Sequence, residues 1–329
     1  MVSAGRKVST RDPYRREGAL PFSGTYYPLG FPLTIRTNSE QVLRAAHEAW
    51  GRQEPLFRRR PIEIQVTVQP EGEAVGELPA YGGRWREIAL VADRHNFAVM
   101  DGQALRAYCF VSEKTAADRL RLRMYFLEAM AYGLLCQGYA VPLHGASVAR
   151  GGRGLLLCGA SGAGKSTLAL AAARAGWTFI CDDATWIIGD RTDRLAVGNP
   201  HQARFREDAP DHFPELAAYV ARQRPNGKIS LEVPLEDFPG IRRAAQCSID
   251  GLVMLRRGAR GGPRLAPIAA EEVVDELLSQ MPGYGEEVAA WYERTLSRLE
   301  NAPAWRLEYT TLREGLELLD EASNLLENT

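Results

Sequence analysis

The chain has 329 residues, of which 45% are hydrophobic and 25% are charged, and its formal net charge at pH 7 is −1. These values predict a globular protein with a full hydrophobic core, organised as two domains or as one large domain with an appendage. The near-zero net charge excludes a general electrostatic attraction to nucleic acid or to anionic lipid.

The cysteines predict free thiols in a reducing, cytoplasmic setting. Their number is odd and their spacing matches neither a zinc site nor a redox motif. They are Cys109, Cys136, Cys158, Cys181 and Cys247. The Arg-rich segment 1–18 lacks the apolar stretch of a signal peptide. The longest apolar stretch, 125–143, contains Glu128 and Gln137 and therefore predicts a core helix followed by a strand, not a membrane span.

The first half predicts a strand-rich α+β domain. Residues 1–28 are expected to form a flexible tail. A helix capped by Asn38 or Ser39 is expected to follow the first strand, and a long helical pattern covers 115–136. The expected strands are 31–36, 62–68, 86–92, 97–100 and 105–111. Gly138 lies where a left-handed helix C-cap is expected, and we place the domain boundary there, between 29–138 and 139–329.

The second half predicts an α/β domain. Strands at 141–149 and 154–158 flank a turn at 150–153, and a helix at 165–175 leads to a strand at 177–181, which makes a β-α-β unit. Further along the chain, the pattern predicts strands at 229–233, 251–255 and 305–309 and helices at 270–280, 285–299 and 312–326.

A P-loop pattern lies between the expected strand at 154–158 and the expected helix at 165–175. Its residues are Gly159, Ala160, Ser161, Gly162, Ala163, Gly164, Lys165 and Ser166. The glycines allow backbone N–H groups to surround phosphate, and the helix N-terminus adds its positive dipole. Lys165 is predicted to reach the β- and γ-phosphates of ATP, and Ser166 to offer its hydroxyl to Mg²⁺. The alternative is an ordinary glycine-rich turn between a strand and a helix.

Two aspartates, Asp182 and Asp183, follow the next strand. If the crossover between the two strands is right-handed and parallel, both strands end at the same edge of the sheet, so this pair should face the phosphates. One carboxylate could hold Mg²⁺ and the other could take the proton of an attacking nucleophile. The alternative is a solvated turn that ends the strand.

His144 is predicted to lie beside the P-loop. If 144–149 and 154–159 form a hairpin in which residue 149 faces 154, then His144 faces Gly159, where it could pair with a carboxylate or touch phosphate. The alternative is a structural histidine at a strand end.

Three further segments give weaker signals. Arg204, Arg206 and His212, near Asp208 and Asp211, could contact phosphate or an acceptor, although the segment favours a solvated charged loop. In the segment 225–228, Asn-Gly indicates a tight turn, and Lys228 is a second candidate phosphate contact. The run 58–60 of three arginines is expected to be a solvated face, because no aromatic residue is interleaved with it.

Together these motifs resemble the catalytic domain of HPr kinase/phosphorylase. The similarity rests on His144-Gly145-Ala146, the short hairpin, 155–167 and 177–183, and covers about 142–189. That family is related in fold to phosphoenolpyruvate carboxykinase. Its later Arg-Gly-Ile-Gly type segment is not evident in this sequence. The chain is therefore more similar to the looser group of HPr kinase-related proteins, some of which phosphorylate a serine of a peptide.

The resemblance implies a kinase that transfers the γ-phosphoryl group of ATP to a serine hydroxyl of a protein or peptide. It places Gly159 to Thr167 on the ATP phosphates and Ser166 with Asp183 on Mg²⁺. Asp182 or Asp183 would act as the base, supported by His144, and relatives of the family often assemble, so a homo-oligomer is possible. A nucleotide-binding regulatory module or an ATPase with little phosphotransfer is the alternative; a transporter ATPase is disfavoured, because the sequence has neither a Leu-Ser-Gly-Gly-Gln segment nor a membrane span.

Overall fold

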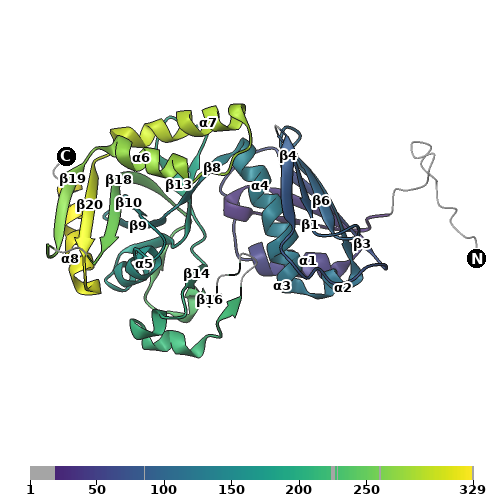
Figure 1. The fold of residues 1–329 in the computed structure, drawn as a ribbon, viewed down its shortest axis with the longest axis horizontal. Coiled ribbons are helices and arrows are strands. Elements are labelled where there is room, and N and C mark those ends of the chain that lie inside the picture. Colours follow the sequence, from purple (N-terminus) through teal and green to yellow (C-terminus); the bar gives the residue numbers. More distant parts are fainter. Residues whose placement is uncertain (1–18, 85, 224–226, 228, 259–260, 328–329) are drawn as a thin grey trace, which may run out of the picture.

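The computed structural model describes residues 19–84, 86–223, 227, 229–258 and 261–327, and these residues form a mixed α/β fold with several sheets. The first half of the chain builds a seven-stranded sheet and the second half a ten-stranded sheet, and the two halves lie side by side (Figure 1). A small three-stranded sheet is formed by β14 (Gln202–Phe205), β16 (Ile229–Pro234) and β15 (Arg222–Gln223).

The seven-stranded sheet has the order β1-β2-β3-β7-β6-β5-β4. Its strands are β1 (Phe22–Tyr26), β2 (Leu33–Thr37), β3 (Ile62–Gln69), β4 (Ala80–Arg84), β5 (Glu87–Val91), β6 (Phe97–Asp101) and β7 (Arg106–Ser112). Period-two patterns produce strands with one buried and one open face: Met100 and Cys109 are buried, whereas Val99 and Tyr108 remain exposed. The expected tail ends too late, because 22–26 is a strand; residues 1–18 lie outside the described residues.

Four helical segments connect the first sheet to the second. After α1 (Glu40–Trp50), the predicted long helix is interrupted: the chain forms α2 (Glu113–Ala117), α3 (Arg119–Arg121), the π-helical turn η2 (Leu122–Leu127) and α4 (Glu128–Gly138). The reason lies in the buried positions Leu122, Phe126, Met130 and Leu134. Their strict four-residue spacing exceeds the 3.6 residues of an α-helical turn, and the wider π turn absorbs the difference.

The structure tests two predicted helix ends. Ser39 is the N-cap residue of α1, one of the two predicted alternatives, although its side chain makes no capping hydrogen bond. The side-chain amide of Asn38 instead exchanges two hydrogen bonds of 2.8 Å with the backbone of Val68. Gly138 is the last residue of α4, and its φ is not positive. The helix is ended by Tyr139, which has a φ of −126°. A Cβ at Gly138 would lie 3.0 Å from Leu105 Cδ2, so the leucine side chain would have to shift slightly to admit it.

The ten-stranded sheet has the order β17-β11-β9-β10-β18-β13-β12-β8, and β20 joins β18 and carries β19. Its strands are β8 (Ala140–His144), β9 (Ala146–Arg150), β10 (Arg153–Cys158), β11 (Thr178–Cys181), β12 (Ala184–Ile188), β13 (Leu195–Val197), β17 (Arg242–Arg243), β18 (Gln246–Arg257), β19 (Arg264–Ile268) and β20 (Ala304–Tyr309). Leu155 and Leu157 of β10 pack with α5 (Lys165–Arg174) and α8 (Leu312–Glu327), whereas Leu156 faces the side of α6 (Ala270–Ser279) and α7 (Glu286–Leu296). Burial on both faces explains the unbroken apolar run of this strand.

The predicted strand 141–149 is in fact two strands that meet at Gly145. The β9–β10 hairpin has the predicted register, with Ala149 opposite Gly154, but this pairing ends at Ala146. Before the glycine, β8 pairs with β12 instead, so that His144 lies opposite Ala184. Because one residue separates β8 from β9, the sheet must curl until its β8 end comes close to β9. A Cβ at the corner would lie 3.0 Å from the Leu157 carbonyl oxygen, which favours glycine.

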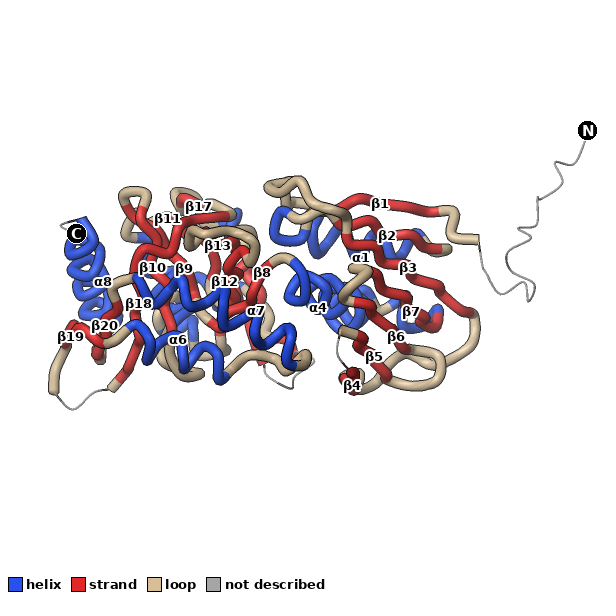
Figure 2. Tube along the Cα trace, turned by 90° about the horizontal axis from the view of Figure 1, so that it is seen from above, coloured by secondary structure: helices blue, strands red, loops and turns tan. Residues whose placement is uncertain are grey.

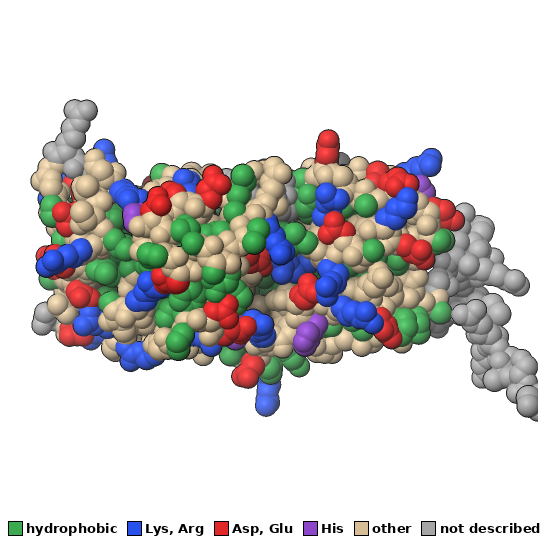
Figure 3. All heavy atoms as spheres, turned by 90° about the horizontal axis from the view of Figure 1, so that it is seen from below, with side chains coloured by type: hydrophobic (Ala, Val, Ile, Leu, Met, Phe, Trp, Pro, Cys, Tyr) green, Lys and Arg blue, Asp and Glu red, His purple; other side chains and the backbone are tan. Residues whose placement is uncertain are grey.

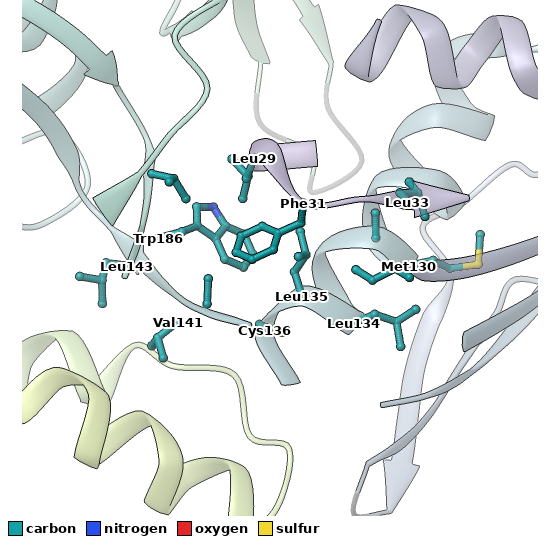
Figure 4. Packing of buried hydrophobic residues seen from close by; sticks show 14 of the residues in the cluster. Leu29, Phe31, Leu33, Met130, Leu134, Leu135, Cys136, Val141, Leu143 and Trp186 are labelled. Carbon is teal, nitrogen blue, oxygen red and sulfur yellow. The ribbon is translucent and has the colours of Figure 1, made fainter. Parts of the chain in front are cut away.

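One hydrophobic cluster runs through both halves of the chain. Figure 4 shows Leu29 and Phe31 close to Trp186 of β12, with Leu135 of α4 and Leu143 of β8 beside them. In the view of Figure 2, α4 lies between the first sheet and β8. The position at which we predict a domain boundary is therefore crossed by continuous packing.

Phe31 is expected to be a major contributor to this packing. It is fully buried, and its ring stacks on Phe57 at 4.4 Å and on Tyr139 at 5.2 Å. The Phe31→Ala substitution should lower the free energy of unfolding by about 3–5 kcal/mol, because it leaves a cavity where the halves meet. Urea unfolding measures this loss. Val220→Ala at a position that is 75% exposed is the control, with an expected change within about 0.5 kcal/mol.

The surface carries charges of both signs. Figure 3 shows Lys and Arg interspersed with Asp and Glu over the face seen from below. The side chains of 58–60 are exposed, as predicted. Among the described residues, none of the helices has the length and apolar character needed to cross a bilayer.

Candidate functional site

The predicted P-loop connects β10 to α5. Gly159, Gly162 and Gly164 have φ values of 138°, 91° and 95°, which other residues rarely adopt, and Gly164 is the N-cap of α5. The side chain of Lys165 is turned back into the loop, where Nζ donates to the carbonyl oxygens of Gly159 at 2.7 Å and Ala160 at 3.3 Å. The loop thus holds a buried ammonium group on two of its own carbonyl oxygens, next to a helix N-terminus, and both the charge and the helix end are suited to binding an anion.

Tyr309, at the end of β20, supports the loop from behind. Its hydroxyl donates to the Ala163 carbonyl oxygen at 2.7 Å and would lie only 2.1 Å from a Cβ at Gly164. The sequence pattern did not indicate this residue, because its contact crosses 146 positions of the chain.

The Gly164→Ala substitution is therefore expected to damage the loop. The left-handed backbone alone costs about 1–2 kcal/mol, and the overlap with the Tyr309 hydroxyl adds to this cost. Thermal unfolding and nucleotide titration should both show a loss. Gly152→Ala is the matched control, because Gly152 has φ 84° and open space around its Cβ position, so that it bears the backbone cost only. Adding Tyr309→Phe to Gly164→Ala should recover part of the loss; equal losses for Gly164→Ala and Gly152→Ala would contradict the overlap.

The two aspartates lie where the predicted topology places them, at the end of β11. Both β10 and β11 are antiparallel to β9, so they run parallel to each other with β9 between them. The hydroxyl of Ser166 donates to the backbone carbonyl of Asp182 at 3.3 Å, which ties the first turn of α5 to the aspartate pair. The P-loop and the aspartates are thereby brought together at one edge of the sheet.

The environments of the two carboxylates differ. Asp182 is buried, and its Oδ2 accepts a hydrogen bond from the backbone N–H of Arg204 at 2.9 Å. Burial, reinforced by the neighbouring carboxylate of Asp183, raises the pKa of Asp182 to about 7, while the N–H and the charge of Arg204 oppose this shift. The side chain of Asp183 is 37% exposed and therefore accessible.

His144 contacts Asp183 rather than the P-loop glycine. Its Nδ1 lies 3.3 Å from Oδ1 of Asp183, and its partner across the strands is Ala184. The predicted position opposite Gly159 is wrong because the strand turns at Gly145 into another part of the sheet. The anticipated contact with a carboxylate is present. An imidazole at this distance can orient the carboxylate and stabilise its charge.

A buried polar cluster holds the corner beside this pair. The hydroxyl of Thr185 donates to the Gly145 carbonyl oxygen at 3.0 Å and lies 2.5 Å from the hydroxyl of Ser147. It also lies 3.2 Å from Sγ of Cys181. These contacts fix the start of β12, and with it Asp183, relative to the β8–β9 corner. Sequence reasoning missed this cluster, because single polar residues within apolar strands have no distinctive spacing.

The segment after Asn199 does reach the site, although the sequence favoured a solvated loop. Strand β14 places the side chain of Arg204, which is 24% exposed, within 3.7 Å of Glu128 on α4. Arg206 donates to Ser161 Oγ at 2.9 Å and so lies against the P-loop. His212 is 3.4 Å from Arg257. Lys228 lies outside the described residues, and of that turn only Gly227, with φ 78°, is described.

The protein atoms of this edge fit a nucleotide better than a bare metal ion. Within the described residues there is no group of three or more His, Cys, Asp or Glu side chains that could hold a metal. A magnesium ion here would need phosphate oxygens to complete its coordination, with Ser166 and an aspartate as protein ligands. The five cysteines are free, four of them are buried, and none belongs to a metal site among the described residues.

A cavity of about 400 Å³ opens beside the aspartates, between the two halves of the chain. Asp182, Asp183 and Arg204 line one side of it. Tyr81, Tyr132 and their neighbours from the first half line the other side. The sequence did not predict this cavity, because it depends on how the two halves pack.

Comparison with known proteins gives limited matches. A family model described as "SynChlorMet cassette protein ScmC" matches residues 107–205, which is less than half of the chain but includes the P-loop, both aspartates and His144. No curated protein matches the chain. Among solved structures, the HPr(Ser) kinase/phosphatase from Coxiella burnetii is similar over 55% of this chain and 97% of its own, with 12% sequence identity and a TM-score of 0.30. A likeness at this TM-score establishes neither a shared fold nor a shared function.

Proposed function

We propose that the protein is an ATP- and Mg²⁺-dependent kinase that transfers the γ-phosphoryl group to a serine hydroxyl of a protein or peptide. Its second half would be a P-loop domain of the HPr kinase/phosphoenolpyruvate carboxykinase type. The observation that carries the proposal is the position of the aspartates: Ser166 binds the backbone of Asp182, and the carboxylates of Asp182 and Asp183 line an open cavity. A nucleotide on one side and an acceptor on the other would meet at these two groups.

Each site residue then has a distinct role. The backbone of 159–164 and the ammonium group of Lys165 would hold the β- and γ-phosphates, and Arg206 stands beside them at Ser161. Asp183, accessible and oriented by His144, would accept the proton of the acceptor hydroxyl. In the transfer, a bond forms between the acceptor oxygen and the γ-phosphorus, the bond between that phosphorus and the β–γ bridging oxygen breaks, and ADP leaves.

Magnesium would neutralise charge on the phosphate oxygens, with Ser166 and Asp183 or Asp182 as its protein ligands. One carboxylate would serve the metal and the other would take the proton. Asp183 is the more exposed of the two carboxylates, which favours it as the group that contacts the acceptor hydroxyl.

The proposal is tested by incubating the full chain with γ-labelled ATP, Mg²⁺ and serine-containing peptides or proteins. Label should appear on the acceptor, and hydrolysis without acceptor should be slow, since a kinase must exclude water. The Asp183→Asn variant should lose transfer by about 10²–10⁴-fold, the usual contribution of a general base. Asp190→Asn is the control, because Asp190 pairs with Arg59 at the surface. Undiminished transfer by Asp183→Asn would rule out the assigned role.

One observation favours a second candidate, a nucleotide-responsive module with little turnover. The ammonium group of Lys165 is already bound by two carbonyl oxygens of its own loop, so binding of a nucleotide must rearrange it. Tight ATP binding with no transfer to any acceptor would support this alternative.

A further inference from the structure

We infer that the cavity between the two halves binds a flexible peptide segment in which the acceptor serine is followed or preceded by a large apolar or aromatic residue. This inference rests on the proposed kinase function and names the class of acceptor. It is carried by the position, shape and charge of the cavity.

The position of the cavity makes it the approach to the reacting groups. Asp182 and Asp183 form part of its wall, and Ser166 contacts the backbone of Asp182. A hydroxyl group in the cavity would therefore stand next to the carboxylates on the side that the P-loop does not occupy. The volume of about 400 Å³ lies at the lower end of the range for small-ligand pockets, about 300–1,000 Å³. It admits a few side chains rather than the surface of a folded domain.

One wall of the cavity is apolar and aromatic. Tyr132 of α4 lies 5.5 Å from the ring of Trp186, and Met124 of the π-helical turn lines the same space. Tyrosine, tryptophan and methionine are the side chains that commonly receive an inserted aromatic or apolar anchor. The first half of the chain and β12 thus provide a pocket for the residue next to the serine.

The apolar wall continues to the surface. Leu78 is 43% exposed and Tyr81 is 55% exposed, and both belong to the lining. A small molecule confined to the cavity would leave this exposed rim uncovered. A peptide passing out of the cavity would cover it, and this favours a chain segment as the occupant.

The charges of the lining select against acidic neighbours. The lining carries three carboxyl groups, those of Asp182, Asp183 and Glu128, and one guanidinium group, that of Arg204. Glu128 is shared between Arg204 at 3.7 Å and Arg123 at 3.2 Å. The accessible carboxylate of Asp183 is therefore the charge that an acidic neighbour of the serine would meet. An acidic residue beside the acceptor serine would be repelled, while a neutral or basic one would be accepted.

The experiment compares peptides that differ only in the residue next to the serine. A Phe neighbour should lower the KM of phosphotransfer by about 10- to 100-fold relative to Ala, the value of burying one aromatic side chain, and an Asp neighbour should raise it. Tyr81→Ala should raise the KM for the Phe peptide. Tyr108→Ala, at a tyrosine that is 43% exposed on the outer face of the same sheet, is the matched control and should leave it unchanged.

A charge substitution separates recognition from a structural role. Leu78→Arg should improve transfer to the Asp peptide while weakening transfer to the Phe peptide, which a merely destabilised protein would not do. A binding experiment with the same peptides, in which Ser is replaced by Ala, tests the cavity without requiring transfer. Fluorescence anisotropy measures this binding. Preferential binding of the Phe version would support the inference.

The outcomes distinguish the two proposals. If label is transferred to all peptides with equal KM, the inferred acceptor class is wrong and the kinase function stands. If none of the peptides is labelled but the Ser-to-Ala Phe peptide binds in the Tyr81-dependent manner, the cavity assignment stands and the kinase function fails. Transfer to a small hydroxylated molecule in place of every peptide would overturn the inference.

Discussion

Replacing Lys165 by Met is expected to lower ATP-dependent phosphotransfer by about 10²–10³-fold, the usual loss when one preorganised charge at a reacting centre is removed. In the structure, Nζ sits inside the loop on the carbonyl oxygens of Gly159 and Ala160. When a nucleotide binds, its phosphate oxygens would replace these carbonyl oxygens as partners of the ammonium group. Removing the charge should therefore lower both the affinity for the nucleotide and the rate of transfer. Methionine preserves the length and apolar stem of the side chain and removes its charge.

Lys114→Met provides the control for this substitution. Lys114 is exposed and pairs with Glu73 on the first half, away from the P-loop. Isothermal titration with ATP and a single-turnover transfer assay measure the two effects separately. If Lys165→Met binds ATP as tightly as the wild type, the loop does not bind phosphate in the manner proposed.

The sequence predicts the local secondary structure around the candidate site well. The eight-residue P-loop, the strand before it and the helix after it are set by neighbouring residues, and the β9–β10 hairpin has the predicted register because a two-glycine turn at Gly151 and Gly152, with φ 57° and 84°, specifies it. The position of the aspartates followed from the parallel arrangement of β10 and β11, even though the structure inserts β9 between them.

What the sequence did not predict depends on contacts between distant segments. The turn at Gly145 moves His144 to Asp183, and a Cβ at this glycine would crowd the Leu157 carbonyl oxygen. Arg204 reaches Asp182 through strand pairing in the three-stranded sheet, 22 residues away. The aromatic wall around Tyr132 arises from packing between the two halves. None of these contacts leaves a periodic pattern in the chain.

Asp182 should make the folded protein less stable as the pH rises, whereas most carboxylates make it more stable, and the Asp182→Asn substitution should remove this effect. Burial, and then the charge of Asp183, holds the pKa of Asp182 near 7 in the folded protein, against about 3.9 in an unfolded chain. Between these values the folded state binds more protons than the unfolded state, so the free energy of unfolding falls as the pH rises. The contribution of Asp182 is fully present below about pH 4 and is lost as the pH rises through about 7.

Asparagine cannot ionise, so the stability of Asp182→Asn relative to the wild type should increase between pH 4 and 7 and then level off. Urea unfolding at a series of pH values, without nucleotide or Mg²⁺, measures this difference. The Asp183→Asn variant should keep the effect but move it to lower pH, because the neighbouring negative charge is gone. Parallel stability curves for the wild type and Asp182→Asn would contradict the raised pKa. If this effect is found, the ionised side chain of Asp182 lowers the stability of the folded protein. A group that lowers stability in this way is expected where it serves phosphotransfer and not folding.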